Sequence, residues 1–424
     1  MTTAILLTHG TGGDVNPFVA IGRELRRQGH DVVLLTHAPY AAAARDAGLR
    51  FEPIDTGESH ERHELRTPQL LQARGPAALG DFYRQGGLID QIRREVDLLR
   101  KFHRPGETVL VGRHTSALST LIAAESTGAP CAWVALSPTQ IRTTKAALVN
   151  VRNGLGGELD GIRAAAGLAP MAHWAGWFEL PDLIVGAWPR WFDEAGERSP
   201  ARVRLTGFIR SDADVPDVAD LPAFAPGAPR PILVTGGTGR MHDRFYALAV
   251  EAAARLDRPT LVVAPDRAML PGPLPPGAHW VPRLPFPAAF PRAGVVLHHG
   301  GIGTAATALA AGAPQVVLAD GSDRPDNAAR LAAHGLARWA DAADCTPERL
   351  AALLEAALAD TGHATRYAEV RDPSAEPAER VAAALVAGLA GTVVTGTRAA
   401  RMRLAALTPA QRAQLLARRA NGAA

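Results

Sequence analysis

Residues 295–328 read VVLHHGGIGTAATALAAGAPQVVLADGSDRPDNA, and this stretch decides the fold. A run of β-forming residues ends at His298, two glycines follow shortly after, and an Ala-rich segment begins near Thr304. The pattern predicts a strand, a tight turn and the start of a helix. Exposed amides and the helix dipole at such a start form a seat for a diphosphate. The residues expected to line this seat are Gly301, Ile302, Gly303, Thr304 and the imidazole of His298.

A second polar cluster follows the predicted helix. Gly312 and Pro314 restart the chain as another apolar strand, which ends in the polar residues 320–327. In an open parallel sheet both clusters lie at the carboxyl edge, where ligands bind. A phosphate seat beside the carboxylate of Asp323 and the guanidinium of Arg324 suits a nucleotide sugar.

The two clusters together resemble the donor-binding motif of the family-1 glycosyltransferases of the GT-B fold. That motif reads H-x-G-x-x-[GS]-[ST] and, further along, D-Q-x-x-N-A; here residues 298–304 read HHGGIGT and residues 323–328 read DRPDNA. The likeness extends over most of the chain and is strongest to bacterial natural-product and rhamnosyltransferase-like members. The simpler alternative is an unrelated strand and helix with a buried histidine.

The resemblance implies an α/β protein of the GT-B class, in which two Rossmann-like domains face each other across a cleft. It also implies an inverting hexosyltransferase. Such an enzyme moves a hexose or deoxyhexose from a dTDP- or UDP-sugar to a hydroxyl of a small-molecule natural product or a lipid. Two other functions stay open: a GT-B-fold nucleotide-sugar epimerase, and a catalytically inactive homologue that acts as a partner protein.

Composition excludes several other classes. A chain of 424 residues, 47% of them hydrophobic, is long enough for two domains with separate cores. The net charge is only +3 and no basic face with interleaved aromatics is present, so we expect no nucleic-acid partner. Two cysteines and the absence of a leader before the first strand favour the cytoplasm. The most apolar run, 381–397, is rich in Ala, Gly and Thr, which predicts a packed helix and no stable membrane insertion.

Near the start, a strand at 4–8 is followed by HGTGGDVNP at 9–17, a helix at 18–28 and a strand at 31–36. A Rossmann dinucleotide loop is the first rival interpretation. Val15 stands where that loop needs its third glycine, and the second strand ends in Thr36 and His37 where an acidic ribose ligand is required. The dinucleotide interpretation is therefore set aside.

The same loop resembles the glycosyltransferase pattern G-[DH]-x-x-P, which makes Asp14 the candidate general base for the acceptor hydroxyl. The alternative role for Asp14 is capping of the helix that follows. His9 is the second candidate base. Plant relatives pair a catalytic His with an Asp after a later strand; here the strand at 108–112 ends in Arg113 and His114, so that dyad cannot be carried over.

Residues 52–102 and 140–183 are polar, and we expect them to be irregular. The resemblance implies that these segments shape the acceptor pocket, as such segments do in GT-B glycosyltransferases. The aromatics Trp174, Trp177 and Phe178 suit a flat or hydrophobic acceptor, although core packing explains them equally well. The HERH run that begins at His60 lacks the HExxH spacing of zinc proteases and is interpreted as a solvated loop. No metal and no cofactor are expected beyond the co-substrate, a dTDP- or UDP-sugar.

A linker is expected between the two halves at residues 211–231, because this segment is rich in Pro, Asp and Ala and shows no hydrophobic periodicity. The expected units are an acceptor-binding Rossmann-like domain at 1–210, the linker at 211–231, a nucleotide-sugar-binding Rossmann-like domain at 232–372, a helix crossing back at 373–397, and a tail with a short helix at 398–424.

In the second half, Gly237 and Thr238 follow a strand and are expected to approach the diphosphate from the opposite side; a Gly-rich hairpin is the alternative. Arg283 and Leu284 stand where the family has an aromatic that stacks on the nucleobase. Ala306 replaces the family's ribose-binding Glu, which favours dTDP, lacking a 2′ hydroxyl, over UDP. The family's Asp–Gln pair contacts the sugar hydroxyls, so the resemblance implies that Asp323 and Arg324 hold the donor sugar. Arg324 in place of Gln disfavours cationic aminosugars.

The tail sequence LTPAQRAQLLARR has Thr at a helix N-cap, Pro at N1 and Gln at N3. It resembles short segments that border nonribosomal peptide synthetase domains, which implies docking to a peptide synthetase. The alternative is a flexible basic tail. The expected partners are the small-molecule acceptor and the nucleotide sugar, and a homodimer is left open.

Overall fold

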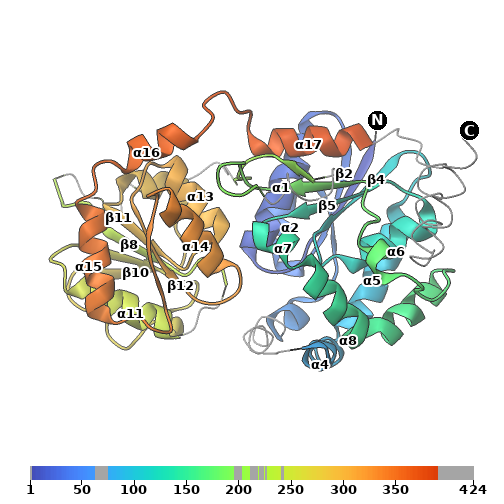
Figure 1. The fold of residues 1–424 in the computed structure, drawn as a ribbon, viewed down its shortest axis with the longest axis horizontal. Coiled ribbons are helices and arrows are strands. Elements are labelled where there is room, and N and C mark those ends of the chain that lie inside the picture. Colours follow the sequence, from blue (N-terminus) through green and yellow to red (C-terminus); the bar gives the residue numbers. More distant parts are fainter. Residues whose placement is uncertain are drawn as a thin grey trace, which may run out of the picture.

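The structure, a computed structural model, describes residues 2–62, 75–194, 203–210, 218, 224, 227–239 and 243–389. The predicted tail helix after residue 398 and most of the predicted linker lie outside the described residues. Two parallel sheets, each with helices on its faces, form two domains that lie side by side (Figure 1). The predicted α/β GT-B architecture is confirmed.

The first domain contains a seven-stranded sheet of order β3-β2-β1-β4-β5-β6-β7, with every pair parallel. Its strands are β1 (Thr3–Leu7), β2 (Asp31–Thr36), β3 (Arg50–Pro53), β4 (Thr108–Arg113), β5 (Cys131–Ala135), β6 (Leu183–Gly186) and β7 (Val203–Leu205). Its helices are α1 (Gly12–Arg27), η1 (Ala38–Tyr40), α2 (Ala41–Asp46), α4 (Pro76–Gln85), α5 (Leu88–Phe102), α6 (Leu118–Thr127), α7 (Pro138–Arg142), α8 (Thr144–Ala165) and α9 (Trp174–Trp177).

The second domain contains a six-stranded sheet of order β10-β9-β8-β11-β12-β13, also all parallel. Its strands are β8 (Ile232–Thr235), β9 (Thr260–Val263), β10 (Ala278–Val281), β11 (Val295–His298), β12 (Gln315–Ala319) and β13 (Arg338–Asp341). The helices from here to the end of the described chain are α11 (Asp243–Ala254), η3 (Arg267–Met269), α12 (Phe286–Ala289), η4 (Phe290–Arg292), α13 (Ile302–Ala310), α14 (Arg324–Ala333), α15 (Pro347–Leu358), α16 (His363–Val370) and α17 (Ala378–Leu389).

The central strands are short apolar runs buried on both faces, as parallel sheets covered by helices require. In the first sheet the strand order reverses between β1 and β4, and in the second between β8 and β11. Ligands bind outside the carboxyl ends of strands at such switch points. The loops after these four strands carry the HGTGGD, RHT, GGTG and HGGIGT segments, so the fold itself gathers most of the predicted site residues.

The segments expected to be irregular are largely helical, so that prediction was wrong. Helix α5 buries Leu88, Ile92, Val96 and Leu99, whose spacing is that of an amphipathic helix. Helices α4 and α8 pack closely through glycines: a Cβ on Gly154 would lie 2.4 Å from the Pro76 carbonyl oxygen. Both helices also contact α5, and the buried side chains of α8 belong to the same apolar core as those of α5.

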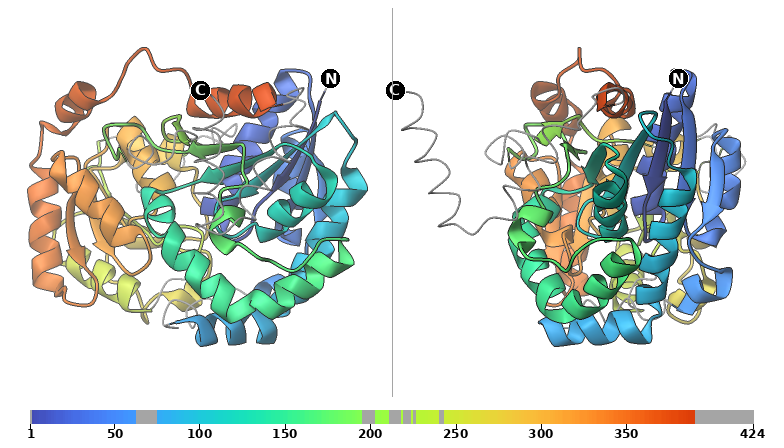
Figure 2. Two further views of the ribbon diagram at one scale, coloured as in Figure 1. Left: turned by 45° about the vertical axis from the view of Figure 1, so that its right-hand side comes forward. Right: turned by 90° about the vertical axis from the view of Figure 1, so that its right-hand side faces the viewer.

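Helix α17 lies on the first domain, although it follows the second domain in sequence (Figures 1 and 2). It packs on α1, and Ala378, Ala382 and Val386 are buried in the core of the first domain. Among the described residues, no helix combines the length and the hydropathy that a membrane-spanning segment needs.

A shared apolar cluster joins the two domains behind the switch points. Trp188 and Phe192 of the first domain pack with Leu309 of α13 and Leu331 of α14. Beside this cluster, the buried carboxylate of Asp193 forms ion pairs with guanidinium groups from both domains. The domains are therefore held in one relative arrangement by burial and by charge.

Candidate active site

The loop after β1 is fixed by contacts between its own residues. The Thr11 amide donates a hydrogen bond of 3.1 Å to Oδ2 of Asp14, and the Thr8 hydroxyl donates one of 3.0 Å to the Asp14 carbonyl oxygen. A Cβ on Gly10 would lie 2.2 Å from Oδ2 of Asp14, and φ there is +105°, so only glycine fits. Asp14 therefore also has the capping role that the sequence left open.

Arg113, at the end of β4, ties this loop to the neighbouring strand. Its guanidinium lies 2.8 Å from Oδ1 of Asp14 and donates a hydrogen bond of 3.2 Å to the His9 carbonyl oxygen. Burial raises the pKa of Asp14, and the charge of Asp323 in the second domain acts in the same direction, although Arg113 and the Thr11 amide oppose them. Asp14 thus lies within electrostatic reach of a residue predicted to hold the donor sugar.

His9 is paired with a carboxylate that the sequence analysis did not identify. Nε2 of His9 lies 2.7 Å from Oε1 of Glu95, which is 1% exposed. Gln91 and Ser119 donate two further hydrogen bonds to Glu95, at 2.8 and 2.7 Å. Burial alone raises the pKa of a carboxyl group, but here His9 and the two donors outweigh it and the pKa of Glu95 is lowered. A His–carboxylate pair therefore lies at the first switch point.

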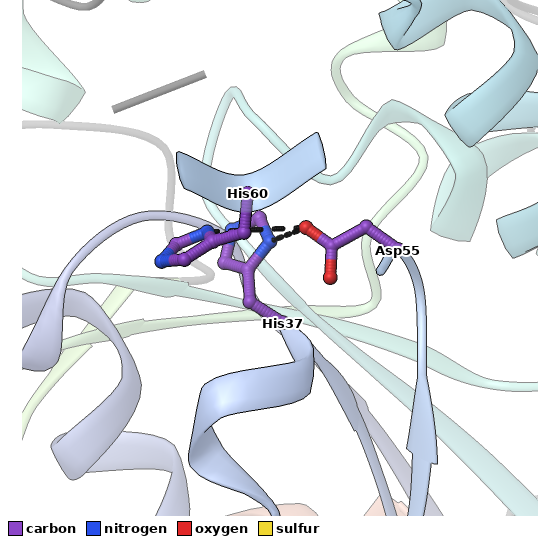
Figure 3. A group of neighbouring side chains, drawn as sticks. All are labelled: His37, Asp55 and His60. Atoms are coloured by element: carbon purple, nitrogen blue, oxygen red, sulfur yellow. Dashed lines mark hydrogen bonds and ion pairs between the residues drawn. The ribbon is translucent and has the colours of Figure 1, made fainter. Parts of the chain in front are cut away.

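A second His–carboxylate pair supports the loop from the side of β2 and β3 (Figure 3). The Gly10 amide donates to Nε2 of His37 at 2.9 Å, and Nδ1 of His37 donates to Oδ2 of Asp55 at 2.6 Å. The ring of His60 lies against that of His37, with centroids 4.3 Å apart. His60 is buried, so its interpretation as part of a solvated loop was wrong.

Candidate metal-ligand atoms of His37, Asp55 and His60 lie within 4.8 Å of one another. The hydrogen bonds define the state of the His37 ring, because Nε2 must accept from an amide and Nδ1 must therefore carry the proton. The other oxygen of Asp55 accepts from the Ala38 amide at 3.0 Å. His37 and Asp55 are thus engaged in holding the loop, and a metal ion would have to displace their hydrogen bonds.

In the second domain, helix α13 begins at Ile302 with Gly301 as its N-cap, close to the predicted start. Gly300 has φ +95°, and its amide donates to Nδ1 of His298 at 3.2 Å. Nε2 of His298 donates to the side-chain oxygen of Gln315 at 3.1 Å, and burial lowers the pKa of the ring to about 4. Both ring nitrogens form hydrogen bonds within the second domain, so His298 stabilises the glycine turn. The sequence predicts that this ring donates a hydrogen bond to a diphosphate, and in this structure neither nitrogen is free to do so.

The ring of the next residue, His299, lies beside the two glycine turns at Gly301 and Gly237. A Cβ on Gly301 would lie 2.5 Å from its Nε2, and a Cβ on Gly237 would lie 2.6 Å from its Cε1. The imidazole is therefore in contact with both glycine loops that were predicted to approach a diphosphate. Burial, with the charge of Arg324, holds its pKa well below the ordinary value, so the ring is neutral.

Asn327 joins the two motifs of the second domain. Its side-chain amide donates to the Gly300 carbonyl oxygen at 3.1 Å and to Oδ2 of Asp323 at 3.2 Å. The guanidinium of Arg324 donates to the Asp320 carbonyl oxygen at 2.8 Å. The structure thus brings the start of α14 beside the glycine turn, as the predicted register of the two motifs requires.

The two glycine-rich loops meet across the domain boundary. A Cβ on Gly12 of α1 would lie 3.0 Å from the side chain of Thr238, and a Cβ on Gly239 would lie 3.6 Å from that of Thr11. Arg283 is exposed in the loop after β10, whereas Leu284 packs in an apolar cluster of the second domain. Neither of these two residues contacts the glycine turns in any described interaction.

A cavity of about 2370 Å³ lies between the domains, and its lining includes His114 of the loop after β4. Phe178, Trp191 and Phe208 line it from the first domain, and Ala306 and Tyr367 line it from the second. Trp177 is buried in the core of the first domain, so packing explains that residue, whereas Phe178 both packs and faces the cavity.

Comparison with known proteins agrees with this geometry. Residues 4–95 match the glycosyltransferase family 28 N-terminal domain, and residues 247–387 match the erythromycin biosynthesis protein CIII-like C-terminal domain. The chain is 28% identical to O-mycaminosyltylonolide 6-deoxyallosyltransferase of Streptomyces fradiae over 85% of this chain and 91% of that protein. It is 28% identical to 4'-demethylrebeccamycin synthase of Lentzea aerocolonigenes over 76% of this chain and 84% of that protein.

Solved structures share the fold. The glycosyltransferase of kitacinnamycin superposes with a TM-score of 0.70 at 21% identity, covering 92% of this chain and all but 1% of that one. SnogD of Streptomyces nogalater superposes with a TM-score of 0.65 at 20% identity, covering 91% and 99%. Two facing parallel-sheet domains, with glycine turns at both switch points, define the GT-B fold. The chain belongs to the family-1 glycosyltransferases of this fold.

Proposed function

We propose that this enzyme is an inverting glycosyltransferase that moves a hexose or deoxyhexose from a dTDP- or UDP-sugar to a hydroxyl of a small-molecule natural product or lipid. The observation that carries the proposal is the meeting of the two switch-point loops. Gly12 lies against Thr238, and Asp14 lies within electrostatic reach of Asp323. A sugar held at the start of α14 would therefore face the loop that carries the candidate bases.

The donor diphosphate would occupy the start of α13. Amides at Gly301, Ile302, Gly303 and Thr304 have no partner within the helix at its first turn, and the helix dipole favours the charge that develops on the leaving group. The neutral ring of His299 and the Gly237 turn complete this seat, with Thr238 at its rim. This electrostatic stabilisation is the largest contribution we expect to catalysis, and it requires no cofactor or metal ion.

The start of α14 would hold the sugar through Asp323 and Arg324, and the loop at Arg283 and Leu284 would take the nucleobase. Ala306 at the position of a ribose-binding Glu supports dTDP over UDP. A relative whose name describes 6-deoxyallosyl transfer supports a deoxyhexose. Asp14 and His9 are the two groups able to take the proton of the acceptor hydroxyl.

The test is a donor panel followed by a product search. Isothermal titration should show tighter binding of dTDP than of UDP, and mass spectrometry should show a glycosylated product from a dTDP-sugar and candidate acceptors. Clearly tighter binding of UDP would reverse the donor preference. A changed sugar in the absence of any acceptor would indicate an epimerase, and donor binding without turnover across many acceptors would indicate an inactive homologue.

A further inference from the structure

Glu95 is a carboxylate among apolar neighbours. The other buried residues of α5 are aliphatic or aromatic, yet Glu95 is 1% exposed in the same face. Burying a carboxylate is costly unless it is paired and hydrogen-bonded. Its partners come from three elements: His9 from the loop after β1, Gln91 from α5 and Ser119 from α6. The chain therefore pairs a buried charge with one particular imidazole at the edge of the cleft.

This pairing determines which nitrogen of His9 can accept a proton. An ionised carboxylate only accepts hydrogen bonds, so Nε2 of the neutral ring carries the proton that points at Glu95. The lone pair is then on Nδ1. That nitrogen lies 3.5 Å from the Ser116 hydroxyl, too far for a strong hydrogen bond, and the side chain is 16% exposed. The lone pair of the neutral ring is thus held on Nδ1, on a side chain that is partly exposed.

Asp14 is in a different situation. One oxygen is in an ion pair with Arg113 and the other accepts the Thr11 amide. A proton arriving on this carboxylate would weaken both contacts, which together hold the loop at the start of α1. Burial favours protonation of Asp14, but its bonds give it a structural task that the His9 ring does not have.

Building on the proposed glycosyl transfer, we propose that Nδ1 of His9 takes the proton of the acceptor hydroxyl and that Glu95 is the residue that positions the ring. Asp14 then organises the loop through Arg113 and the Thr11 amide. The arrangement has the logic of a base oriented by a carboxylate, in which the carboxylate stabilises the imidazolium that forms.

The step balances without a further reactant. The acceptor O–H bond breaks and its proton passes to Nδ1 of His9, while the oxygen forms a bond to C1 of the sugar. The bond between C1 and the diphosphate oxygen breaks, and its electron pair leaves with the nucleoside diphosphate. The charged groups around the imidazolium are Glu95, which favours it, and Arg113, which opposes it; the ring of His37 lies 6.2 Å away.

The experiment uses the full chain with dTDP-glucose as donor and two probe acceptors, 4-nitrophenol and a primary alcohol, with donor hydrolysis recorded in parallel. His9→Ala should lower kcat about 10²- to 10⁴-fold, with dTDP affinity unchanged. Added imidazole should restore part of the lost turnover. The loss should be larger with the alcohol than with the phenol, because the more acidic phenol needs less help from a base.

Glu95→Gln keeps the size of the side chain and removes its charge. It should lower kcat and move the acid limb of the pH–rate profile to lower pH, because the imidazolium loses its counter-charge. Glu125→Gln is the matched control: Glu125 is paired with Arg163 elsewhere in the same domain, so this change alters a structural ion pair and should leave the profile where it was. His9→Gln, which keeps a donor for Glu95, serves if His9→Ala does not fold.

Two results would overturn the assignment, and they are distinguishable. The first result is that the wild type transfers glucose, His9→Ala keeps a kcat close to that of the wild type, and Asp14→Asn is inactive. The base is then Asp14, and only this inference fails. If the wild type binds neither dTDP nor UDP, the proposed function fails and takes the inference with it.

Discussion

The Thr139 hydroxyl, in the first domain, donates a hydrogen bond of 2.8 Å to Oδ2 of Asp326 in helix α14 of the second domain. The same carboxylate also pairs with Arg330 one turn later, and Arg330 pairs with Asp193 of the first domain. Helix α14 therefore carries the predicted sugar-binding residues at its start and the contacts to the other domain along the next turn. The predicted donor-sugar site and the contacts between the domains therefore lie on the same helix, α14.

Asp193 is the most buried charge in this contact, and we expect Asp193→Asn to destabilise the protein by about 3 kcal/mol. The change leaves two guanidinium groups, Arg142 and Arg330, without their shared carboxylate. The expected loss lies at the low end for buried pairs because Arg142 is half exposed. Urea unfolding measures it. The exposed pair of Arg255 and Glu348 is the control: Glu348→Gln should shift stability much less than Asp193→Asn, and equal shifts would contradict the prediction.

Gly301→Ala should weaken dTDP binding about tenfold or more, because its methyl group would fall 2.5 Å from Nε2 of His299 and displace that ring from the phosphate seat. Isothermal titration with dTDP measures the change. Gly161→Ala is the control, since Gly161 lies in helix α8 with no atom within 4 Å of an added Cβ. Unchanged affinity in Gly301→Ala would remove His299 from the proposed seat.

The donor side of this fold was largely predictable because its signals are local. The strand, the glycine turn and the start of α13 depend on residue types only a few positions apart, and Gly300 indeed has a positive φ. The direction of the His298 ring was not predictable. Its partner, Gln315, lies in the neighbouring strand, and only the register of β11 and β12 brings them together.

The acceptor side was less predictable because its key contacts are distant in sequence. His9 and Glu95 are 86 positions apart and meet only after α5 packs beside β1 and β4. A signal was present: Ile92, Val96 and Leu99 mark the buried face of a helix, and Glu95 lies on that face. A charge at a core position of a periodic segment indicates a buried partner, and the sequence does not say which one.

His114 should make the free energy of unfolding decrease at acidic pH, and His114→Phe should reduce that pH dependence. Burial, with the nearby charge of Arg113, lowers the pKa of His114 to about 3, whereas the unfolded chain has the ordinary value of 6.5. As pH falls from 6.5 towards 3, His114 binds a proton in the unfolded state but not in the folded state. The free energy of unfolding therefore falls by up to ~1.4 kcal/mol per pH unit. Above pH 6.5 this effect is absent. Urea midpoints at pH 7.5, 6 and 5 measure the slope, and an equal slope in the variant would refute the assignment.

Removal of metal ions should leave turnover unchanged. Nδ1 of His37 and Oδ2 of Asp55 are bonded to each other, while Nε2 of His37 and Oδ1 of Asp55 accept the Gly10 and Ala38 amides. The start of α13 supplies the charge stabilisation of the leaving group in the proposed reaction. Dialysis against EDTA, followed by assays with and without added Zn²⁺, measures this. A loss of activity that Zn²⁺ restores would make the His37, Asp55 and His60 cluster a metal centre after all.

Arg324 should set donor preference more than turnover. Its guanidinium lies at the start of α14, next to Asp323 and anchored to the Asp320 carbonyl oxygen, and it keeps its charge although burial lowers its pKa. A cationic aminosugar at this place meets a like charge, and two unit charges a few ångströms apart interact by more than about 1 kcal/mol in a partly buried site. Arg324→Gln should therefore raise the kcat/KM for an aminosugar donor, relative to a neutral hexose donor, by about tenfold.

The measurement is a competition between the two dTDP-sugars for one shared acceptor, with products separated by mass. Arg255→Gln, an exchange of the same kind at an exposed position just after α11, should leave the product ratio as in the wild type. The ratio cancels any general loss of activity, so it reports only how the site distinguishes the two sugars. A ratio that stays constant in Arg324→Gln would place the guanidinium away from the sugar and leave Asp323 as the residue of this turn that holds it.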